Sequence, residues 1–524
     1  MKEARRNAAR VRNRRLTSIL CLLLVSWVAP TAEARGPNQP LSLTVLAQEG
    51  EPAVLRYQSE RHRVVRASSK GPLAAPVTTG LELRFVGTVP SPGRVGVTLA
   101  LTLTLADRGR PSNPRDLQVD ATFEAADGES VLVPETAAGP AIIATPRILA
   151  ANGGTPMLSL RVVVPIGGGA FELPVQNVSK RVSLVGAEGA ENSIHEAMGE
   201  SFVTGVADGQ AILTTRDTGT GLAFQVSTEG GSDIGLDLSV DCALVDEHVP
   251  SRSVPGRYGL RHKLQLPTQR SVHLETVAKA GSGESLALAG IVGADDRSEL
   301  IIFVTPTLVQ GSSAPQVLVE ATTVIVGRGG VTHQIEGATD RTRFLDEFRT
   351  QATEPNRGIL GRTEEHSFVV GHPGGQPATT TLEESTLVEF IPTALAPDEF
   401  RADVHLSRVD LAEPRRHPMK GPSGFDWIHL PRTRSLQVST NVVIQDGQTV
   451  VLGGQVFQRR IPWRERRAET VVLATVNALG SGAIELSGRL AQVREETQRS
   501  WPGASDVERS FEENLFCAEV EPAP

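Results

Sequence analysis

The chain has 524 residues, of which 40% are hydrophobic, with 50 Gly, 34 Pro and a formal net charge of −8. This length accommodates about three domains, and the Gly and Pro content favours strands and turns over long helices. The acidic balance, without a basic patch, argues against nucleic acid as a partner.

Residues 1–34 have the three parts of a signal peptide. Seven basic residues lie within the first fifteen positions, an apolar run follows at 18–29, and Ala32-Glu33-Ala34 provides a small-x-small cleavage site. The apolar run is shorter than the about 20 residues of a membrane-spanning helix, although an uncleaved anchor is the alternative. We therefore expect export and cleavage after Ala34, which leaves a net charge of −13.

The mature chain keeps two of the three cysteines, Cys242 and Cys517. An exported chain meets oxidising conditions, which permit a single disulfide between them. Two unpaired thiols are the alternative, and the sequence leaves both open. Two cysteines are too few for a structural zinc site.

One β-hairpin pattern occurs three times. Residues 117–133, 272–290 and 436–454 each place a turn glycine, namely Gly128, Gly283 or Gly447, before Glu or Gln, then Ser or Thr, then an apolar run. Asp-Gly between β-branched runs is a strong hairpin signal, because Gly accepts φ > 0 without a Cβ clash. The three glycines are thus predicted to be structural turn residues.

The neighbours of these hairpins recur in the same order. A strand pair precedes each hairpin, at 80–105, 221–240 and 387–406, and an apolar strand with a threonine follows, at Thr145, Thr305 and Thr475. Repetition at this period indicates tandem domains. The predicted boundaries are 35–150 for a truncated repeat 1 that lacks its opening strand, 151–314 for repeat 2 and 315–482 for repeat 3. A tail at 483–524 is expected to be partly disordered.

Two segments are predicted to be short helices. Residues 190–202 and 340–351 carry apolar residues three to four positions apart, as in Phe344, Leu345 and Phe348. Each precedes a Gly-Gln turn, at Gly209 and Gly375, which we align with Gly50-Glu51 of repeat 1. The expected fold class is mainly β with a few short helices (α+β).

Repeat 3 carries the clearest resemblance to a known family. The order of 317–321, the turn at Gly375-Gln376, the stretch 389–393 and the hairpin 446–454 is similar to the core β-domain of secretins, the outer-membrane channels of bacterial secretion and type IV pilus systems. Repeat 2 follows with 299–306, and repeat 1 is weaker. The resemblance implies three tandem secretin-like β-domains. The gate-and-lip segment of the family has no counterpart here.

No catalytic, cofactor or metal motif is present in the sequence, so we expect neither an enzyme nor a cofactor. Glu383-Glu384 is interpreted as a solvated loop in preference to a carboxylate pair. The arginine-rich segment 459–467 is interpreted as a soluble hairpin tip, with contact to anionic lipid or a partner as the alternative. The alternating strand 99–105 favours a half-buried sandwich strand over a membrane-barrel wall, because only 4% of residues are aromatic.

The resemblance implies a structural secretin-like component in protein secretion, exported to the outer membrane or periplasm. Its implied partners are further copies in a homo-oligomer, or secretion-system proteins, with outer-membrane association and no small-molecule substrate. The alternative is a soluble periplasmic or cell-surface β-repeat protein that binds a partner without forming a pore.

Overall fold

The computed structural model describes residues 40–498, apart from 69–70, 107–113, 135–140, 150–154, 166–176, 208–209, 230–232, 247–248, 256–260, 293–298, 310–314, 327–338, 354–355, 372–377, 422–423, 462–463 and 480–482. The predicted signal peptide, its cleavage site and Cys517 therefore lie outside the described residues. So do the predicted boundaries at 150/151 and 314/315.

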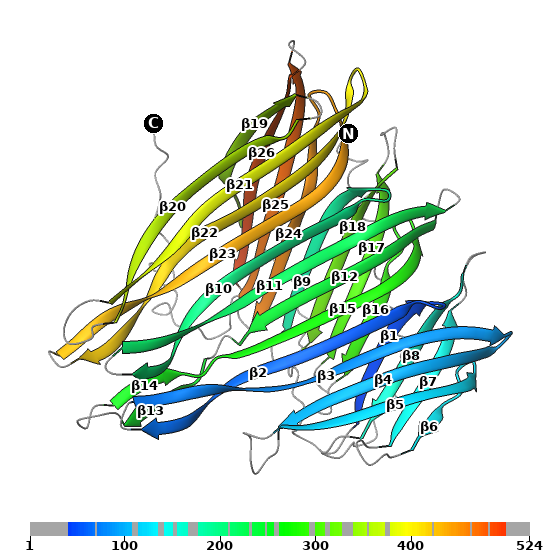
Figure 1. Ribbon diagram of the computed structural model, residues 1–524, viewed down its shortest axis with the longest axis horizontal. Helices are drawn as coiled ribbons and strands as arrows, with labels where there is room; N and C mark the ends of the chain where they lie inside the picture. The colour runs from blue at the N-terminus through cyan, green and yellow to red at the C-terminus, as the bar shows by residue number, and fades with distance from the viewer. Residues whose placement is uncertain are drawn as a thin grey trace.

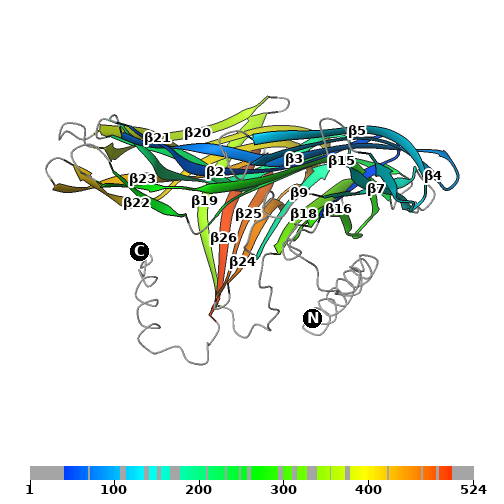
Figure 2. The same ribbon diagram turned by 90° about the horizontal axis from the view of Figure 1, so that it is seen from below.

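Every regular element in the described part of the chain is a β-strand, and nearly all of them belong to two 12-stranded antiparallel sheets. We call the sheet that contains residues 41–48 sheet A and the sheet that contains residues 52–68 sheet B. The two sheets pack against each other; in Figure 2, sheet B forms the upper layer and the strands of sheet A lie beneath it. The expectation of a mainly β fold is confirmed, and the expectation of short helices is wrong.

The strands fall into three units of one shared plan, in which one strand in sheet A is followed by four in sheet B and then three in sheet A. Unit 1 consists of β1 (Leu41–Gln48), then β2 (Pro52–Ser68), β3 (Gly71–Ser91), β4 (Arg94–Ala106) and β5 (Pro114–Ala126), then β6 (Val131–Val133), β7 (Ile142–Leu149) and β8 (Met157–Val164).

Unit 2 repeats the plan and adds a two-stranded ribbon to it. Its strands are β9 (Asn177–Ala187), then β10 (Glu191–Ala207), β11 (Gln210–Glu229), β12 (Asp233–Val245) and β15 (Thr268–Gly281), then β16 (Leu286–Val292), β17 (Glu299–Val309) and β18 (Gln316–Val326). The ribbon joins β12 to β15 and consists of β13 (Ser251–Pro255) and β14 (Arg261–Gln265).

Unit 3 closes the series with the same eight strands. They are β19 (Thr339–Thr353), then β20 (Gly358–Gly371), β21 (Ala378–Ala396), β22 (Glu399–Gly421) and β23 (Gly424–Gln445), then β24 (Thr449–Ile461), β25 (Arg464–Leu479) and β26 (Ala483–Gln498).

The units lie side by side and share both sheets. Sheet A has the order β19-β26-β25-β24, β9-β18-β17-β16, β1-β8-β7-β6. The long pairings of sheet B follow β20-β21-β22-β23, β10-β11-β12-β15, β2-β3-β4-β5, with single bridges at Gln210↔Gly371 and Gly205↔Leu73. Figure 1 shows this row, with unit 3 in yellow-green to red, unit 2 in teal to green and unit 1 in blue to cyan.

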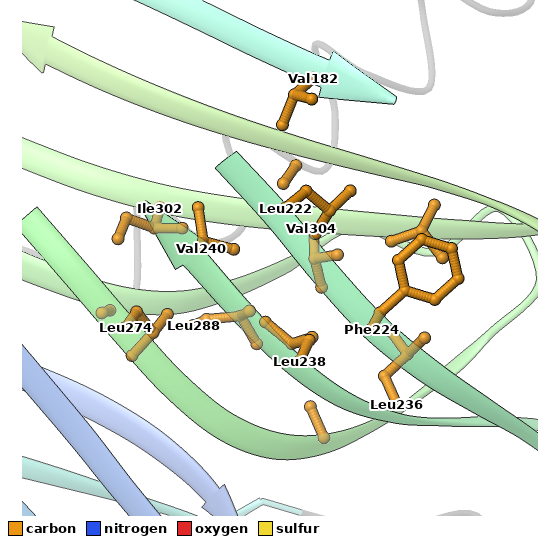
Figure 3. Close-up of a cluster of buried hydrophobic side chains, with 14 of the residues drawn as sticks. Val182, Leu222, Phe224, Leu236, Leu238, Val240, Leu274, Leu288, Ile302 and Val304 are labelled. Carbon is orange, nitrogen blue, oxygen red and sulfur yellow. The ribbon is translucent and has the colours of Figure 1, made fainter. Parts of the chain in front are cut away.

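The core lies between the two sheets. Side chains that alternate along each strand meet there, as period-2 patterning requires. Figure 3 shows this layer in unit 2, where Leu222 and Phe224 of β11 and Leu238 of β12 lie near Ile302 and Val304 of β17. Leu99, Leu101 and Leu103 of unit 1 are buried in the same core, so the segment 99–105 is a half-buried strand of the packed sheets.

The expected helices and three further expectations need correction. The segments 190–202 and 340–351 belong to β10 and β19, where pairing with β11, β23 and β26 overrides the helix-like spacing. Unit 1 is complete, because β1 occupies the place of β9 and β19. Residues 483–498 form β26 and not a disordered tail, and 499–524 lie outside the described residues. Strand order also groups β8 and β18 with the units that precede the expected boundaries.

Candidate functional site

The recurring hairpin turn is a clasp that joins the two sheets. Gly128, Gly283 and Gly447 have φ of +75°, +77° and +72°, values that favour glycine. Each donates its backbone N–H to the carbonyl of the strand after the hairpin, at Pro146, Pro306 and Val476. The three glycines therefore occupy equivalent turns where the chain passes from sheet B to sheet A.

Side chains on both sides of each turn glycine complete the clasp. The preceding residue accepts a hydrogen bond from a backbone N–H of the following strand, to Asp127 Oδ1, Ser282 Oγ and Asp446 Oδ1 at 2.7–3.0 Å. The Ser or Thr two positions after the glycine pairs with the recurring threonine. These hydroxyl pairs are Ser130–Thr145, Ser285–Thr305 and Thr449–Thr475, at 2.8, 2.7 and 2.6 Å. These bonds tie the turn to the strand that follows the hairpin in each unit.

The two junctions between units are the candidate functional surfaces of the molecule. At the 3/2 junction β24 pairs with β9 and β23 pairs with β10; at the 2/1 junction β16 pairs with β1 and β15 pairs with β2. In each case the fifth and sixth of the eight strands of one unit pair with the first two strands of the unit that precedes it in the chain. We call the fifth and sixth strands the trailing edge of a unit and its first two strands the leading edge. Both sheets are therefore continuous across each junction.

The two junctions have the same register, counted from the turn glycines. The leading turns are at Gly189 and Gly50, with φ of +76° and +82°. In sheet B, the residue eight before the trailing glycine pairs with the residue four after the leading glycine, as Ser439↔Ser193 and Glu275↔Val54. Gly50 thus corresponds to Gly189, and not to the predicted Gly209.

A buried threonine makes the same hydrogen bond at both junctions. Thr440 donates its hydroxyl to the carbonyl of Val185, and Thr276 donates to the carbonyl of Leu46 at 2.6 Å. Each threonine lies seven residues before its trailing glycine, and each carbonyl lies four residues before its leading glycine. The side chains are 3% and 2% exposed, so water does not compete for these bonds.

Ion pairs and an amide add to the 3/2 junction. Arg434 Nε lies 2.8 Å from Glu196 Oε1, and Arg432 Nη2 lies 2.7 Å from Glu200 Oε1, with all four side chains mostly buried. Asn192 Oδ1 accepts a bond from the backbone N–H of Asn441 at 3.1 Å. Fixed pairs of this kind specify register more than they add stability.

Two histidines lie near the 2/1 junction, with pKa values shifted in opposite directions. Burial, followed by the charge of Arg216, lowers the pKa of His62. A hydrogen bond to Asp241, at 2.7 Å from Nδ1, raises the pKa of His273 against its burial. Glu60 pairs with Arg216 across the same junction. The two histidines thus lie on β2 and β15, the strands that pair across this junction.

A buried lysine distinguishes unit 2. Lys180 donates from Nζ to the carbonyls of Gly219 and Ala243, at 3.0 Å each, and thereby ties β9 to sheet B. Burial lowers its pKa. Leu41 holds the same place, nine residues before the leading glycine, in unit 1. Cys242 lies on β12 in this core, where burial raises the pKa of its thiol.

The remaining predicted residues do not assemble into a site. Glu383 and Glu384 lie on β21, opposite Glu365 and Glu364 of β20, and so belong to a strand and not to a loop. The backbone of 459–461 and 464–467 forms the β24–β25 hairpin, whereas 462–463 and the side chains of this segment lie outside the described residues.

Within the described ranges, no three His, Cys, Asp or Glu side chains gather to hold a metal ion. A search of the same residues for a helix long and apolar enough to cross a membrane found none. The contacts between units at the two junctions were not predicted from the sequence. The repeated threonine at Thr276 and Thr440 was the signal that could have found them.

Comparison with solved structures finds secretins among the matches, at low identity and low TM-score. No protein-family model and no curated protein sequence matches the chain. The V. cholerae type IV competence pilus secretin PilQ is 12% identical over 67% of this chain and 68% of its own, with a TM-score of 0.14.

Two secretion-system structures match at the same level. The Klebsiella pneumoniae type II secretion outer-membrane complex with PulD is 8% identical, over 71% of this chain and 49% of its own, with a TM-score of 0.13. The Salmonella injectisome secretin InvG is 12% identical, over 70% and 80%, also at 0.13. At these TM-scores the whole chain superposes on none of them, and the description of the units rests on strand order and register.

Proposed function

We propose that this protein is an exported structural component of a bacterial secretion apparatus, in which three fused wall units extend a β-sheet assembly edge to edge. The observation that carries the proposal is the repeated junction. Two successive pairs of units join through both sheets, in one register, with the same buried threonine bond. A chain that repeats one lateral contact in this way is built for lateral association.

The secretin class enters through the sequence resemblance of repeat 3, centred on the hairpin at 446–454. The structure adds that this hairpin is the trailing clasp of unit 3, one of three equivalent clasps. Side-by-side units with continuous sheets remove internal strand edges, as a wall requires. We assign the protein a structural and non-catalytic role at the outer membrane or in the periplasm.

Cell fractionation tests this proposal with the full chain. We expect a form processed after Ala34, in the envelope fraction, within a native particle larger than one chain. Unprocessed cytoplasmic protein would refute the role. A processed chain that remains alone in the periplasm would favour the alternative, a soluble β-repeat binding protein.

A further inference from the structure

We propose that the row of units has one open end and one closed end: the leading edge of unit 3 receives a secretin-like unit of another protein, whereas the trailing edge of unit 1 is a stop. This inference deepens the proposed function and rests on it for the identity of the partner. Of the two partner classes expected from the sequence, it selects a secretion-system protein over a direct homo-oligomer.

The internal junctions define what a working trailing edge contains. Besides the threonine, each has a small residue six positions after the turn glycine, at Gly453 and Ala289, paired with the first strand of the next unit. Space is tight at this point, because a Cβ on Gly453 would lie 2.5 Å from the carbonyl oxygen of Ser183. The trailing strands in sheet A are 13 and 7 residues long in β24 and β16.

Unit 1 departs from this pattern in three ways. Ala121 stands where units 2 and 3 have the threonine, so the hydroxyl donor is missing. Counted from the turn glycine, Pro134 is the sixth residue, as are Gly453 and Ala289, and proline has no backbone N–H to give to a neighbouring strand. Strand β6 lacks the register shift of β24 and β16, so Val133 takes the place of Gly453 and Ala289 in the pairing with the following strand. Strand β6 is three residues long. Short edge strands and edge prolines are devices by which proteins prevent further strand pairing.

The leading edge of unit 3 keeps the strand register of the occupied leading edges, with Pro355 at the sequence position of their turn glycine. Register identifies its positions: Gly358 pairs with Phe390 as Asn192 pairs with Phe224, and Ala352 pairs with Ile484 as Gly186 pairs with Val317. By this register the backbone carbonyl of Gln351 corresponds to the carbonyls of Val185 and Leu46, which accept the threonine hydrogen bonds. Neither β19 nor β20 contains proline.

Apart from the single bridge Gln210↔Gly371 at the far end of β20, this edge has no strand paired with it among the described residues. Ile359 of β20 is 58% exposed, and Leu360 is only partly buried, whereas its counterparts Ile194 and Leu55 are 1% and 0% exposed. The side chain of Thr350 on β19 is nevertheless buried, so the edge keeps a side chain that faces inward. An unpaired strand edge with this pattern is a template for an added strand.

The partner that fits is a secretin-like unit with a complete trailing edge. It carries a threonine seven residues before its turn glycine, to donate to the Gln351 carbonyl, and a small residue six positions after that glycine. A second copy of this chain lacks both, because it offers Ala121 and Pro134.

Restoring the missing residues tests the inference on the purified mature chain. We expect the wild-type protein to remain a single chain at all concentrations in sedimentation equilibrium. The double variant Ala121→Thr/Pro134→Gly should associate head to tail, with its weight-average mass at least doubling as concentration rises. Wild-type protein added to the variant should shorten the assemblies, since it binds at its open end and stops growth at its closed end.

Cysteine cross-linking identifies the edges involved. The shared register places Gln118 of β5 opposite Gly361 of β20, and a Cβ at Gly361 meets only Leu387 Cδ1, at 3.9 Å. In the Ala121→Thr/Pro134→Gly background, separate chains with Gln118→Cys and Gly361→Cys should cross-link. A control chain with Thr393→Cys, exposed on the inner strand β21, should not.

Circular dichroism confirms that each variant is folded, and the single variants Ala121→Thr and Pro134→Ala serve if the double variant is not. Wild-type chains that associate with Gln118–Gly361 cross-links would overturn the inference. Folded variants that stay single, or assemblies that wild-type protein does not shorten, would also overturn it. None of these outcomes alters the fractionation result, so the proposed function can fail or stand independently.

Discussion

The junction threonine gives a sharp test of how the units hold together. Thr276→Val replaces the hydroxyl by a methyl group of similar size, so packing between β15 and β1 is retained. The Leu46 carbonyl, which now accepts a 2.6 Å hydrogen bond from a side chain that is 2% exposed, loses its donor in a region from which water is excluded. An unsatisfied buried polar group of this kind costs about 1–3 kcal/mol.

This cost predicts a local effect at the 2/1 junction. Because about 1.4 kcal/mol corresponds to a factor of 10, opening of β1 from unit 2 should become roughly 5- to 150-fold more frequent. Hydrogen exchange followed by mass spectrometry, on peptides that cover β1 and β15, measures this opening directly. A large multi-unit chain need not unfold in one step, so a single unfolding midpoint is the weaker assay.

A matched control separates the hydrogen bond from the change of residue type. Thr122→Val makes the same replacement on β5, where the side chain is exposed, and surface changes of this kind stay within about ±0.5 kcal/mol. Equal exchange in Thr276→Val and wild type would refute the reasoning. So would a comparable effect of Thr122→Val.

Three further predictions concern the clasp, a histidine and the membrane. Gly447→Val should destabilise unit 3 by about 1–3 kcal/mol in urea unfolding, because φ is +72° while no atom crowds the site; Gly447→Asn, which tolerates this φ, should cost less. The raised pKa of His273 stabilises the folded state below about pH 6.5 and is lost as pH rises through that pKa, so the stability gap to His273→Gln should be largest in acid and close in alkali. The purified mature chain should show no reproducible conductance in planar bilayers, since only 4% of its residues are aromatic and membrane barrels carry aromatic girdles.

The hairpins could be predicted from sequence because their determinants are local. Asp446-Gly447 and its two counterparts specify a turn by backbone conformation alone, and the flanking alternation places one face of each strand in the core. The repeated order of strands followed from the same signals.

The two supposed helices show where local pattern fails. In β19 the register shifts between Phe344 and Asp346, so Leu345 is an extra residue and the apolar positions fall three to four apart, as in a helix. In β10, strands on both sides pair with a segment of Glu, Ala and Met, residues that favour helices in isolation. Partners distant in sequence decided both cases.

The junctions were hidden for a related reason. The bond from Thr276 to Leu46 joins residues 230 positions apart, and the contact between Arg434 and Glu196 joins residues 238 apart. Neither pair has a spacing that a single sequence distinguishes from chance. Only the recurrence of threonine before the turn glycine marked the place, and it marked it in two units of three.

Joining three units in one chain has an evolutionary consequence. In a ring of identical subunits, a single mutation alters every interface at once, so a charge placed in the core would be repeated around the whole ring. Here each unit varies on its own: Lys180 is buried in unit 2 at the place where unit 1 keeps Leu41, and Pro134 alters one edge while Gly453 leaves another intact. A covalently joined row can therefore acquire distinct ends and a distinct middle, which a symmetric assembly of one repeated unit cannot.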